Sequence, residues 1–327
     1  MPSRPDDYRR LASLVASGMP LVGLYSGLQA ILASRMPARN MFIALIEPPH
    51  NLRFPWFADE KIPESPLALY PYEGLTAFLM DRGRRLWKAE EPDFLELTTY
   101  VGVAPADWLG IPFRDRRGEV TGAIVVQTYD EGAGYSEEDA EFLEFASLQV
   151  SLAVQLHAQD SELAVRRIEE LVEQTTELEH LYPGIHAIIA KLIPAARRSF
   201  MIARVDPKAG LFRLVYCRDE WEPGRVEPWN LGAGLSGFVY STSPGFYIYE
   251  DGATPLPEGV SAIGDRPAAF WLGAPIRIEG EVTGVVIIQT YDRSEPITRE
   301  DGLSLQSICP HIGQAIARTE LFRHGMD

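Results

Sequence analysis

Hydrophobic and polar positions along the chain predict the same series of elements twice. In the first half, an amphipathic segment at 24–36 is followed by short apolar runs at 41–46 and 53–58, which Glu47-Pro48-Pro49-His50-Asn51 separates. The corresponding segments of the second half are 181–193, 199–205 and 212–217. A helical period predicts a helix, and short apolar runs split by turn residues predict a strand hairpin. We therefore expect each half to begin with a helix and to continue into an antiparallel sheet.

Three short motifs recur and indicate that the halves are copies of one domain. The pairs are Trp108-Leu109-Gly110 with Trp271-Leu272-Gly273, 118–122 with 280–284, and 127–130 with 289–292. Each copy is too long to be a unit of a solenoid. We expect a first domain at 1–158, which includes the N-terminal helix, and a second domain at 178–327.

The segment that joins the two domains reads as one long helix over 136–181. Ser136 is a good N-cap, acidic residues follow it, and no breaker occurs before Tyr182-Pro183, where the helix should kink or restart. A short heptad rhythm is formed by Ile168, Leu171, Thr175, Leu178 and Tyr182. This rhythm fits a two-stranded seam between protomers, and it fits equally well an amphipathic linker helix that packs on its own domain.

Charge and cysteine content narrow the class of protein. The chain has 46 acidic and 30 basic residues, a net charge of −16, and only Cys217 and Cys309 as cysteines. Such acidity disfavours binding to nucleic acid and to anionic membranes. Two distant cysteines predict no disulfide framework, and we expect a cytoplasmic protein. The uncharged stretch from Leu11 to Ser34 carries several polar and glycine residues, so we interpret it as a packed surface helix and not as a membrane span.

The residues that carry enzyme chemistry do not form a recognisable pattern. None of the six histidines has the spacing of a metal ligand, and GxxxxGK[ST] and GxSxG are absent from the sequence. We therefore expect no enzymatic activity and no metal, and the sequence names no cofactor.

Taken together, the repeated blocks resemble the GAF domain, a small sensory module of signalling proteins. In the first copy the matching blocks are 41–46, 54–60, 74–76, 108–112, 118–130 and 135–139. The subtype is similar to the one found in front of histidine kinases and diguanylate cyclases. The resemblance implies an α/β (α+β) fold with two domains, each a central antiparallel sheet of about six strands flanked by helices, joined by a long helix. The residues that follow the long strand differ from the cyclic-nucleotide-binding type, and neither cysteine suits bilin attachment.

The resemblance also implies a small-molecule pocket in each domain. The ligand-binding candidates are Trp56, Asp59, Glu60, Thr76, Trp108, Gln127, Tyr216, Arg218, Asp219, Glu220, Ser236, Tyr247 and Trp271. For Trp108 and Trp271 the alternative is a role in sealing the core. For Gln127 and Gln289 the amide either reads a ligand or ties down a loop. For Arg218 the choice is between clamping an anionic ligand and pairing with Asp219 or Glu220.

The function that we expect is a non-enzymatic sensor. It would bind a small molecule in one or both pockets, form a homodimer through helices, and signal through a histidine kinase or diguanylate cyclase output domain or through a partner. The alternative is a ligand-free module for dimerisation or scaffolding. The sequence does not identify the ligand.

Overall fold

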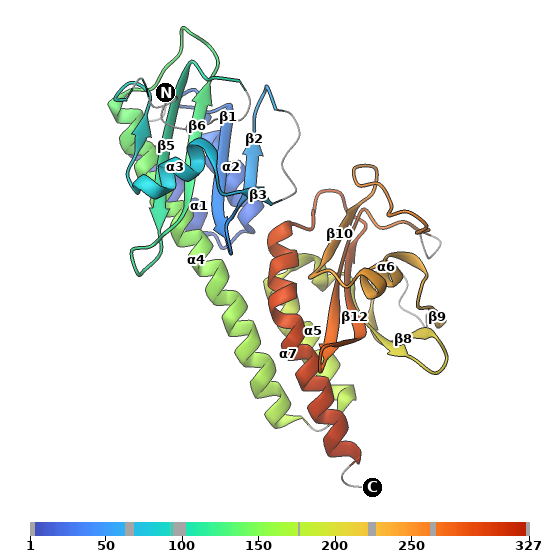
Figure 1. The fold of residues 1–327 in the computed structure, drawn as a ribbon. Helices are drawn as coiled ribbons and strands as arrows, with labels where there is room; N and C mark the ends of the chain where they lie inside the picture. The colour runs from blue at the N-terminus through green and yellow to red at the C-terminus, as the bar shows by residue number, and fades with distance from the viewer. Residues whose placement is uncertain are drawn as a thin grey trace. The chain divides into compact units, whose positions relative to one another are not determined.

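The computed structural model describes residues 4–62, 69–91, 93, 103–175, 177–221, 227–261 and 266–324. The chain divides into two compact units, Met1–His157 (unit 1) and Ala158–Asp327 (unit 2). One helix, α4 (Glu137–Gln174), crosses the boundary between them (Figure 1).

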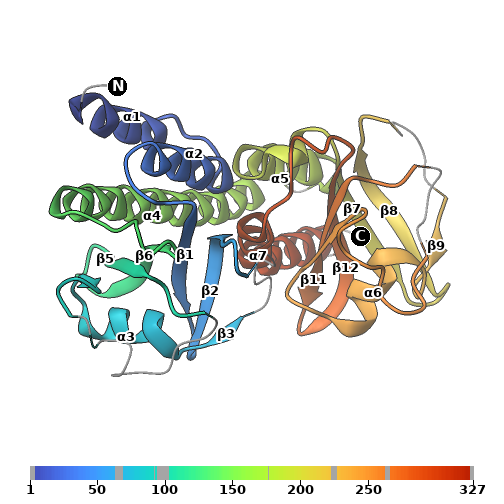
Figure 2. The ribbon, with the colours of Figure 1, turned by 90° about the horizontal axis from the view of Figure 1, so that it is seen from above.

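Unit 1 is built on one antiparallel sheet of six strands, in the order β3-β2-β1-β6-β5-β4. The strands are β1 (Asn40–Glu47), β2 (Asn51–Ala58), β3 (Tyr70–Pro71), β4 (Leu86–Trp87), β5 (Asp107–Arg114) and β6 (Val120–Thr128). One face carries α1 (Arg4–Ala16), α2 (Leu21–Ala33) and the first part of α4, whereas α3 (Gly74–Arg82) covers the other face (Figure 2). The unit therefore has a separate apolar cluster on each side of its sheet.

Unit 2 repeats this plan with the strand order β10-β11-β12-β7-β8-β9. Its strands are β7 (Phe200–Asp206), β8 (Leu211–Arg218), β9 (Trp229–Asn230), β10 (Tyr247–Glu250), β11 (Phe270–Ile278) and β12 (Glu281–Thr290). On one face lie the last part of α4, α5 (Leu178–Leu192), the short 3₁₀ helix η2 (Pro194–Arg197) and α7 (Arg299–His324); α6 (Gly234–Thr242) covers the other. The predicted α+β fold, with two antiparallel sheets flanked by helices and joined by a long helix, is confirmed.

The joining helix is shorter than the sequence predicted. It ends at Gln174, and α5 starts at Leu178 after Glu177 in an extended conformation. A Cβ placed on Gly184 of α5 would lie 2.4 Å from the side chain of Leu171, so the two helices pack closely as a hairpin. Pro183 lies inside α5, where the missing N–H costs one hydrogen bond near the first turn and does not end the helix.

Four of the five residues of the heptad rhythm pack inside unit 2. Ile168 is fully buried, Tyr182 is 6% exposed, and both belong to the core of this unit. Leu171 and Leu178 pack against the same core. Of the two readings of this rhythm, the helix that packs on its own domain is the one that the structure supports.

The uncharged stretch from Leu11 to Ser34 forms two helices in place of the single one that we expected. The chain breaks between α1 and α2 at Gly18, whose φ is +66°, and Pro20 then precedes the first residue of α2. Both residues suit a break, because glycine tolerates a left-handed conformation and proline favours the start of a helix. Within the described part of the chain, no helix is long and apolar enough to cross a membrane.

The recurring Trp-Leu-Gly motif has a packing explanation. Residues two apart on a strand share one face, so the ring of Trp108 lies over Gly110. A Cβ on Gly110 would approach that ring to 2.5 Å, and a Cβ on Gly273 would approach the ring of Trp271 to 2.1 Å. The glycine of each copy therefore makes room for the tryptophan that precedes it.

The helix cap of α7 predicts a pH dependence of stability in unit 2. The Asp301 carboxylate accepts hydrogen bonds from the backbone N–H and the hydroxyl of Thr298, at 2.7 and 2.8 Å. Burial outweighs these bonds and raises the pKa of Asp301 from 3.8 to about 6. The folded state therefore holds the proton more tightly than the unfolded state, and the free energy of unfolding should fall as pH rises from about 4 to about 6.

Asp301→Asn should remove most of this pH dependence, which amounts to roughly 1–3 kcal/mol of unfolding free energy between about pH 4 and about pH 6. The measurement is urea unfolding at a series of pH values. Asp139→Asn, in the matching cap Ser136–Asp139 of unit 1, controls for the loss of a capping charge. A variant at position 301 that keeps the wild-type slope would contradict the assignment.

Candidate functional site

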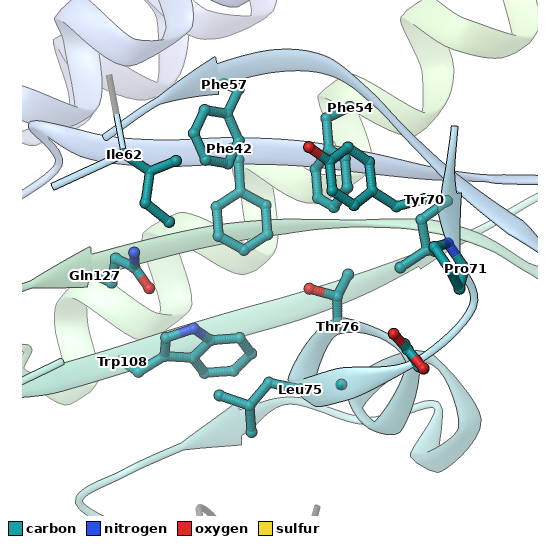
Figure 3. A pocket seen from close by; sticks show the side chains of 13 residues that line it. Phe42, Phe54, Phe57, Ile62, Tyr70, Pro71, Leu75, Thr76, Trp108 and Gln127 are labelled. Carbon is teal, nitrogen blue, oxygen red and sulfur yellow. The ribbon is translucent and has the colours of Figure 1, made fainter. Parts of the chain in front are cut away.

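Unit 1 contains a cavity of about 200 Å³ between its sheet and α3 (Figure 3). Its walls are mostly aromatic and aliphatic. The lining residues are Phe42, Leu52, Phe54, Phe57, Ile62, Tyr70, Pro71, Glu73, Gly74, Leu75, Thr76, Trp108 and Gln127. An apolar hollow with a few convergent polar groups is the usual form of a small-molecule site.

The aromatic wall is positioned by the register of β1 and β2. Phe42 pairs directly with Phe57, and an irregularity in the pairing between Arg53 and Trp56 accommodates Phe54 on the same side. The three ring centroids lie 5.6–5.9 Å apart in stacked and edge-to-face pairs, which fixes the orientation of each ring. Trp108, only 1% exposed, forms the facing wall from β5.

The start of α3 supplies polar groups to the cavity. Gly74 has a φ of +76°, which turns the chain into the helix, and the N-cap Glu73 makes no side-chain capping bond. Thr76 is 8% exposed, its side chain points into the cavity in Figure 3, and its hydroxyl has no hydrogen-bond partner among the described residues. The first N–H groups of a helix lack partners within the helix, so this end of the cavity suits an acceptor oxygen.

At the other end, Gln127 belongs to a small polar network. Its Nε2 donates to Oδ2 of Asp59 at 2.6 Å and to the hydroxyl of Tyr129 at 2.9 Å, and that hydroxyl donates to the same Oδ2 at 3.0 Å. Burial and the Asp59 carboxylate raise the pKa of Tyr129, which keeps its proton on the phenol. Asp59 also accepts from the backbone N–H groups of Lys61 and Ile62 through Oδ1. Gln127 thus both lines the cavity and holds the loop after β2.

Charge in the cavity is negative or absent. Glu73 is the charged residue of the lining and lies at the rim, and no lysine or arginine is among the lining residues that the structure describes. Burying an anion without a charged partner is costly, so this arrangement favours an uncharged ligand.

Two candidates of unit 1 lie away from the cavity. Trp56 packs on the helical side of the sheet, where its Nε1 donates to Oε1 of Gln29 at 3.1 Å. Glu60 pairs with Arg39 at 3.0 Å, and its N–H donates to Asn40. Thr76, Trp108 and Gln127 are the candidates that the fold brings together around the hollow, and Asp59 acts behind Gln127.

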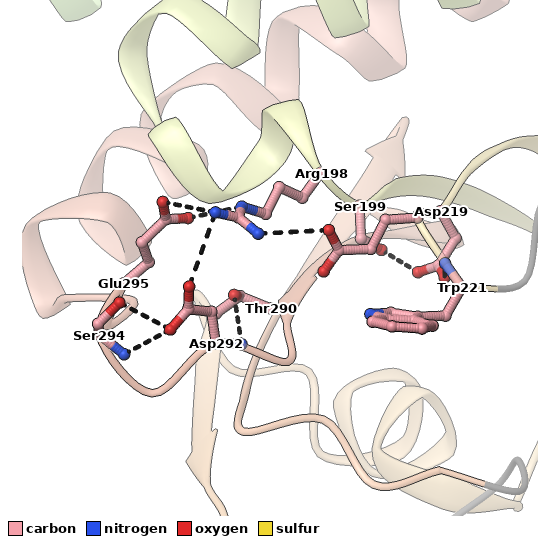
Figure 4. Close-up of polar contacts among 9 residues, drawn as sticks. Arg198, Ser199, Asp219, Trp221, Thr290, Asp292, Ser294 and Glu295 are labelled. Carbon is pink, nitrogen blue, oxygen red and sulfur yellow. Dashed lines mark hydrogen bonds and ion pairs between the residues drawn. The ribbon is translucent and has the colours of Figure 1, made fainter.

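Unit 2 repeats the network at the end of β8, and Figure 4 shows its Asp219 beside Ser199 and Trp221. Asp219, 6% exposed, accepts from Ser199 Oγ at 2.5 Å and from Gln289 Nε2 at 3.0 Å through one oxygen, and from the backbone N–H of Trp221 through the other. Gln289 also donates to the hydroxyl of Tyr291 at 2.7 Å. The amide of each copy therefore ties down the loop that follows the second strand.

Arg198 adds an ion-pair network beside Asp219. Its guanidinium lies 3.4 Å from the carboxylate of Glu220, 3.6 Å from Asp292 and 2.9 Å from Glu295. Glu220 is thus paired with Arg198, and not with Arg218.

The remaining candidates of unit 2 divide between its two faces. Arg218 is exposed on the rim of a hollow that Arg197 also lines, and within the described ranges it forms no ion pair with Asp219 or Glu220. The hydroxyl of Tyr216 lies 2.9 Å from Nδ1 of His186, on the helical side. Burial, with a smaller contribution from Arg218, lowers the pKa of His186 and keeps it neutral, so its Nε2 donates to the carbonyl of Ala196.

Ser236, Tyr247 and Trp271 lie on the α6 side of the sheet. Ser236 and Trp271 are 7% exposed, and Tyr247 packs edge-on against Phe238 at 4.8 Å. At the positions of the phenylalanine wall, unit 2 has Met201, Leu214 and Cys217. The two units therefore present different walls at the same place in the fold.

Sequence reasoning missed the phenylalanine wall and Tyr70. A signal was present, because the strand sequence NLRFPWFA is unusually rich in aromatic residues. Alternation along the strand divides these residues between the two faces, but the irregular pairing near Phe54 shifts that alternation, and a sequence pattern does not reveal such a shift.

Within the described ranges, no group of three or more His, Cys, Asp or Glu side chains is arranged to hold a metal ion. No curated protein matches the chain.

Solved structures that resemble the chain each align with about half of it. A GAF domain of a phosphoenolpyruvate-protein phosphotransferase from Acinetobacter is 18% identical, covers 48% of this chain and 93% of its own, and has a TM-score of 0.41. The corresponding domain from Coxiella burnetii is 21% identical, with coverages of 50% and 96% and a TM-score of 0.42. Free methionine-R-sulfoxide reductase from Neisseria meningitidis, in complex with its substrate, is 14% identical, with coverages of 49% and 90% and a TM-score of 0.40. Residues 27–154, which lie within unit 1, match the family model of the GAF domain.

Proposed function

We propose that the chain is a sensory module whose unit 1 binds a small, uncharged, largely aromatic molecule. The observation that carries the proposal is the aromatic-walled cavity of about 200 Å³ beneath α3. An apolar cavity of about 150 Å³ in another protein holds benzene. The cavity of unit 1 therefore suits one substituted ring, and a linear tetrapyrrole is too large for it.

A route for the signal leads from the helix beside the cavity to α4. Arg85, which follows α3, forms ion pairs with Glu137 at 2.8 Å and Glu144 at 3.6 Å, both in the first turns of α4. A ligand that displaces α3 would alter these pairs. Such a ligand acts only through a difference in its affinity for the two arrangements.

The proposal includes a homodimer and an output partner. Leu148, Leu152 and Leu156 recur every four residues on α4 and are 64%, 43% and 41% exposed. Residues four apart share one helix face, so they form an apolar stripe in unit 1. We propose that this stripe contacts a second copy of the chain. The output domain that we propose is a histidine kinase or a diguanylate cyclase.

The test is thermal unfolding of the purified chain with a panel of small aromatic compounds, organic anions and cyclic nucleotides. A neutral ring compound at a hundredfold excess over its Kd should add about 2.7 kcal/mol to the stability of unit 1, which raises the midpoint by several degrees. Trp108→Phe, which reshapes the wall, should reduce this shift. If no neutral ring compound gives a saturable shift, the ligand-free scaffold is the better description.

A further inference from the structure

The amide of Gln127 has only one orientation that satisfies its neighbours. Its NH₂ group has two hydrogens, of which one goes to the carboxylate of Asp59 and the other to the hydroxyl of Tyr129. The reverse orientation would place the amide oxygen against a carboxylate oxygen, where two acceptors meet without a proton. Asp59 therefore fixes which end of the amide faces the cavity.

As a result, the group that Gln127 presents to a ligand is an acceptor and never a donor. Both amide hydrogens are in use, and Oε1 receives no hydrogen bond from any residue that the structure describes. Figure 3 shows the oxygen of Gln127 on the side of the cavity, toward Trp108. A buried acceptor without a donor is costly, so a ligand that fills the cavity must satisfy it.

The opposite part of the cavity has the complementary character. Thr76 offers an O–H there, and the first turn of α3 has the N–H groups that a helix start leaves without partners within the helix. The aromatic wall lies between these two polar ends.

We infer that the cavity of unit 1 selects ring compounds that carry a hydrogen-bond donor, phenols above all, whose hydroxyl donates to Oε1 of Gln127. The inference rests on the proposed function and specifies the class of ligand. A carboxylate or an ether at the same position would place an acceptor against an acceptor, so benzoates and aryl ethers should be rejected.

Unit 2 provides an internal control. Gln289 is held in the same orientation by Asp219 and Tyr291, but Met201, Leu214 and Cys217 replace the phenylalanine wall. Changes in this second network should leave ring binding in unit 1 unaltered.

The experiment compares 4-methylphenol with its methyl ether, 4-methylanisole, by calorimetric titration of the full chain. We expect the phenol to bind at least about tenfold more tightly, because the ether leaves Oε1 unpaired. Equal affinities would overturn the inference and leave the proposed pocket standing. Absence of binding by both compounds at millimolar concentration would overturn the proposed function as well.

The Asp59→Asn variant tests whether the hydrogen-bonding polarity or the size of the ether weakens its binding. The substituted amide must keep its oxygen on the N–H groups of Lys61 and Ile62, so its NH₂ faces Gln127 and turns that amide over. The cavity then meets a donor, and the preference for the phenol should disappear or reverse. Gln127→Leu should bind both compounds within about twofold, and Asp219→Asn should keep the wild-type preference. If the ether stays weak in Asp59→Asn and in Gln127→Leu, size excludes it and the inference is wrong.

Discussion

Asp219→Ala should lower the free energy of unfolding of unit 2 by roughly 3 kcal/mol. The carboxylate is the shared acceptor for the hydroxyl of Ser199, the amide of Gln289 and the N–H of Trp221. Alanine removes the acceptor that these donors share, the hydroxyl of Ser199 lies in a fully buried residue, and a buried donor left unsatisfied costs about 1–3 kcal/mol. Urea unfolding, followed by tryptophan fluorescence and by hydrogen exchange of each unit, measures the loss.

Asp59→Ala is the matched substitution in unit 1. Asp59 is only half-buried, and water can reach the donors that it leaves, so the loss there should be smaller. We therefore expect the loss of unfolding free energy to be clearly larger for Asp219→Ala than for Asp59→Ala. Equal losses would show that burial of the carboxylate does not determine the cost.

Leu152→Glu should convert the dimer that we propose into a monomer. In a twofold-symmetric interface each substitution occurs on both sides, so two carboxylates would be placed in one apolar contact. We expect the wild-type chain to have the mass of two copies at micromolar concentration and the variant to have the mass of one, as measured by light scattering with size exclusion.

The control is Leu321→Glu, a substitution of another exposed leucine, 73% exposed, outside the stripe of α4. It should leave the mass unchanged. A wild-type chain that is already monomeric at this concentration, or a Leu152→Glu variant that stays dimeric, would refute the assignment of the stripe to a second copy.

Comparison of the chain with itself predicted most of the fold. The recurring Trp-Leu-Gly and glycine motifs fix the same strand pair in both units, and a Cβ on Gly122 or Gly284 would lie 2.5 or 2.6 Å from a backbone oxygen of the neighbouring strand. Such close contacts require glycine, because no other side chain fits, and the glycines can therefore be recognised in the sequence.

Features that result from a balance of several weak conformational preferences could not be predicted from the sequence. The end of α4 at Gln174 has no proline or glycine, although Gly184 of α5 approaches Leu171 of α4 closely. The separation of Trp56 from Phe57 onto opposite faces follows from strand alternation, but the side that holds the cavity depends on where α3 packs. The sequence does not distinguish between the two roles of Gln127, and in the structure its side chain contacts both the loop and the cavity.

The tie between Asp59 and Gln127 has a consequence for how such a module diversifies. The residue that decides whether the cavity offers a lone pair or a proton lies behind the residue that touches the ligand. Replacement of aspartate by asparagine at this one position, which lies outside the lining, would change the class of ligand that binds without altering the shape of the cavity. In a duplicated chain, one domain can undergo this substitution while the other keeps its aspartate. The two domains can then bind ligands of opposite hydrogen-bonding character.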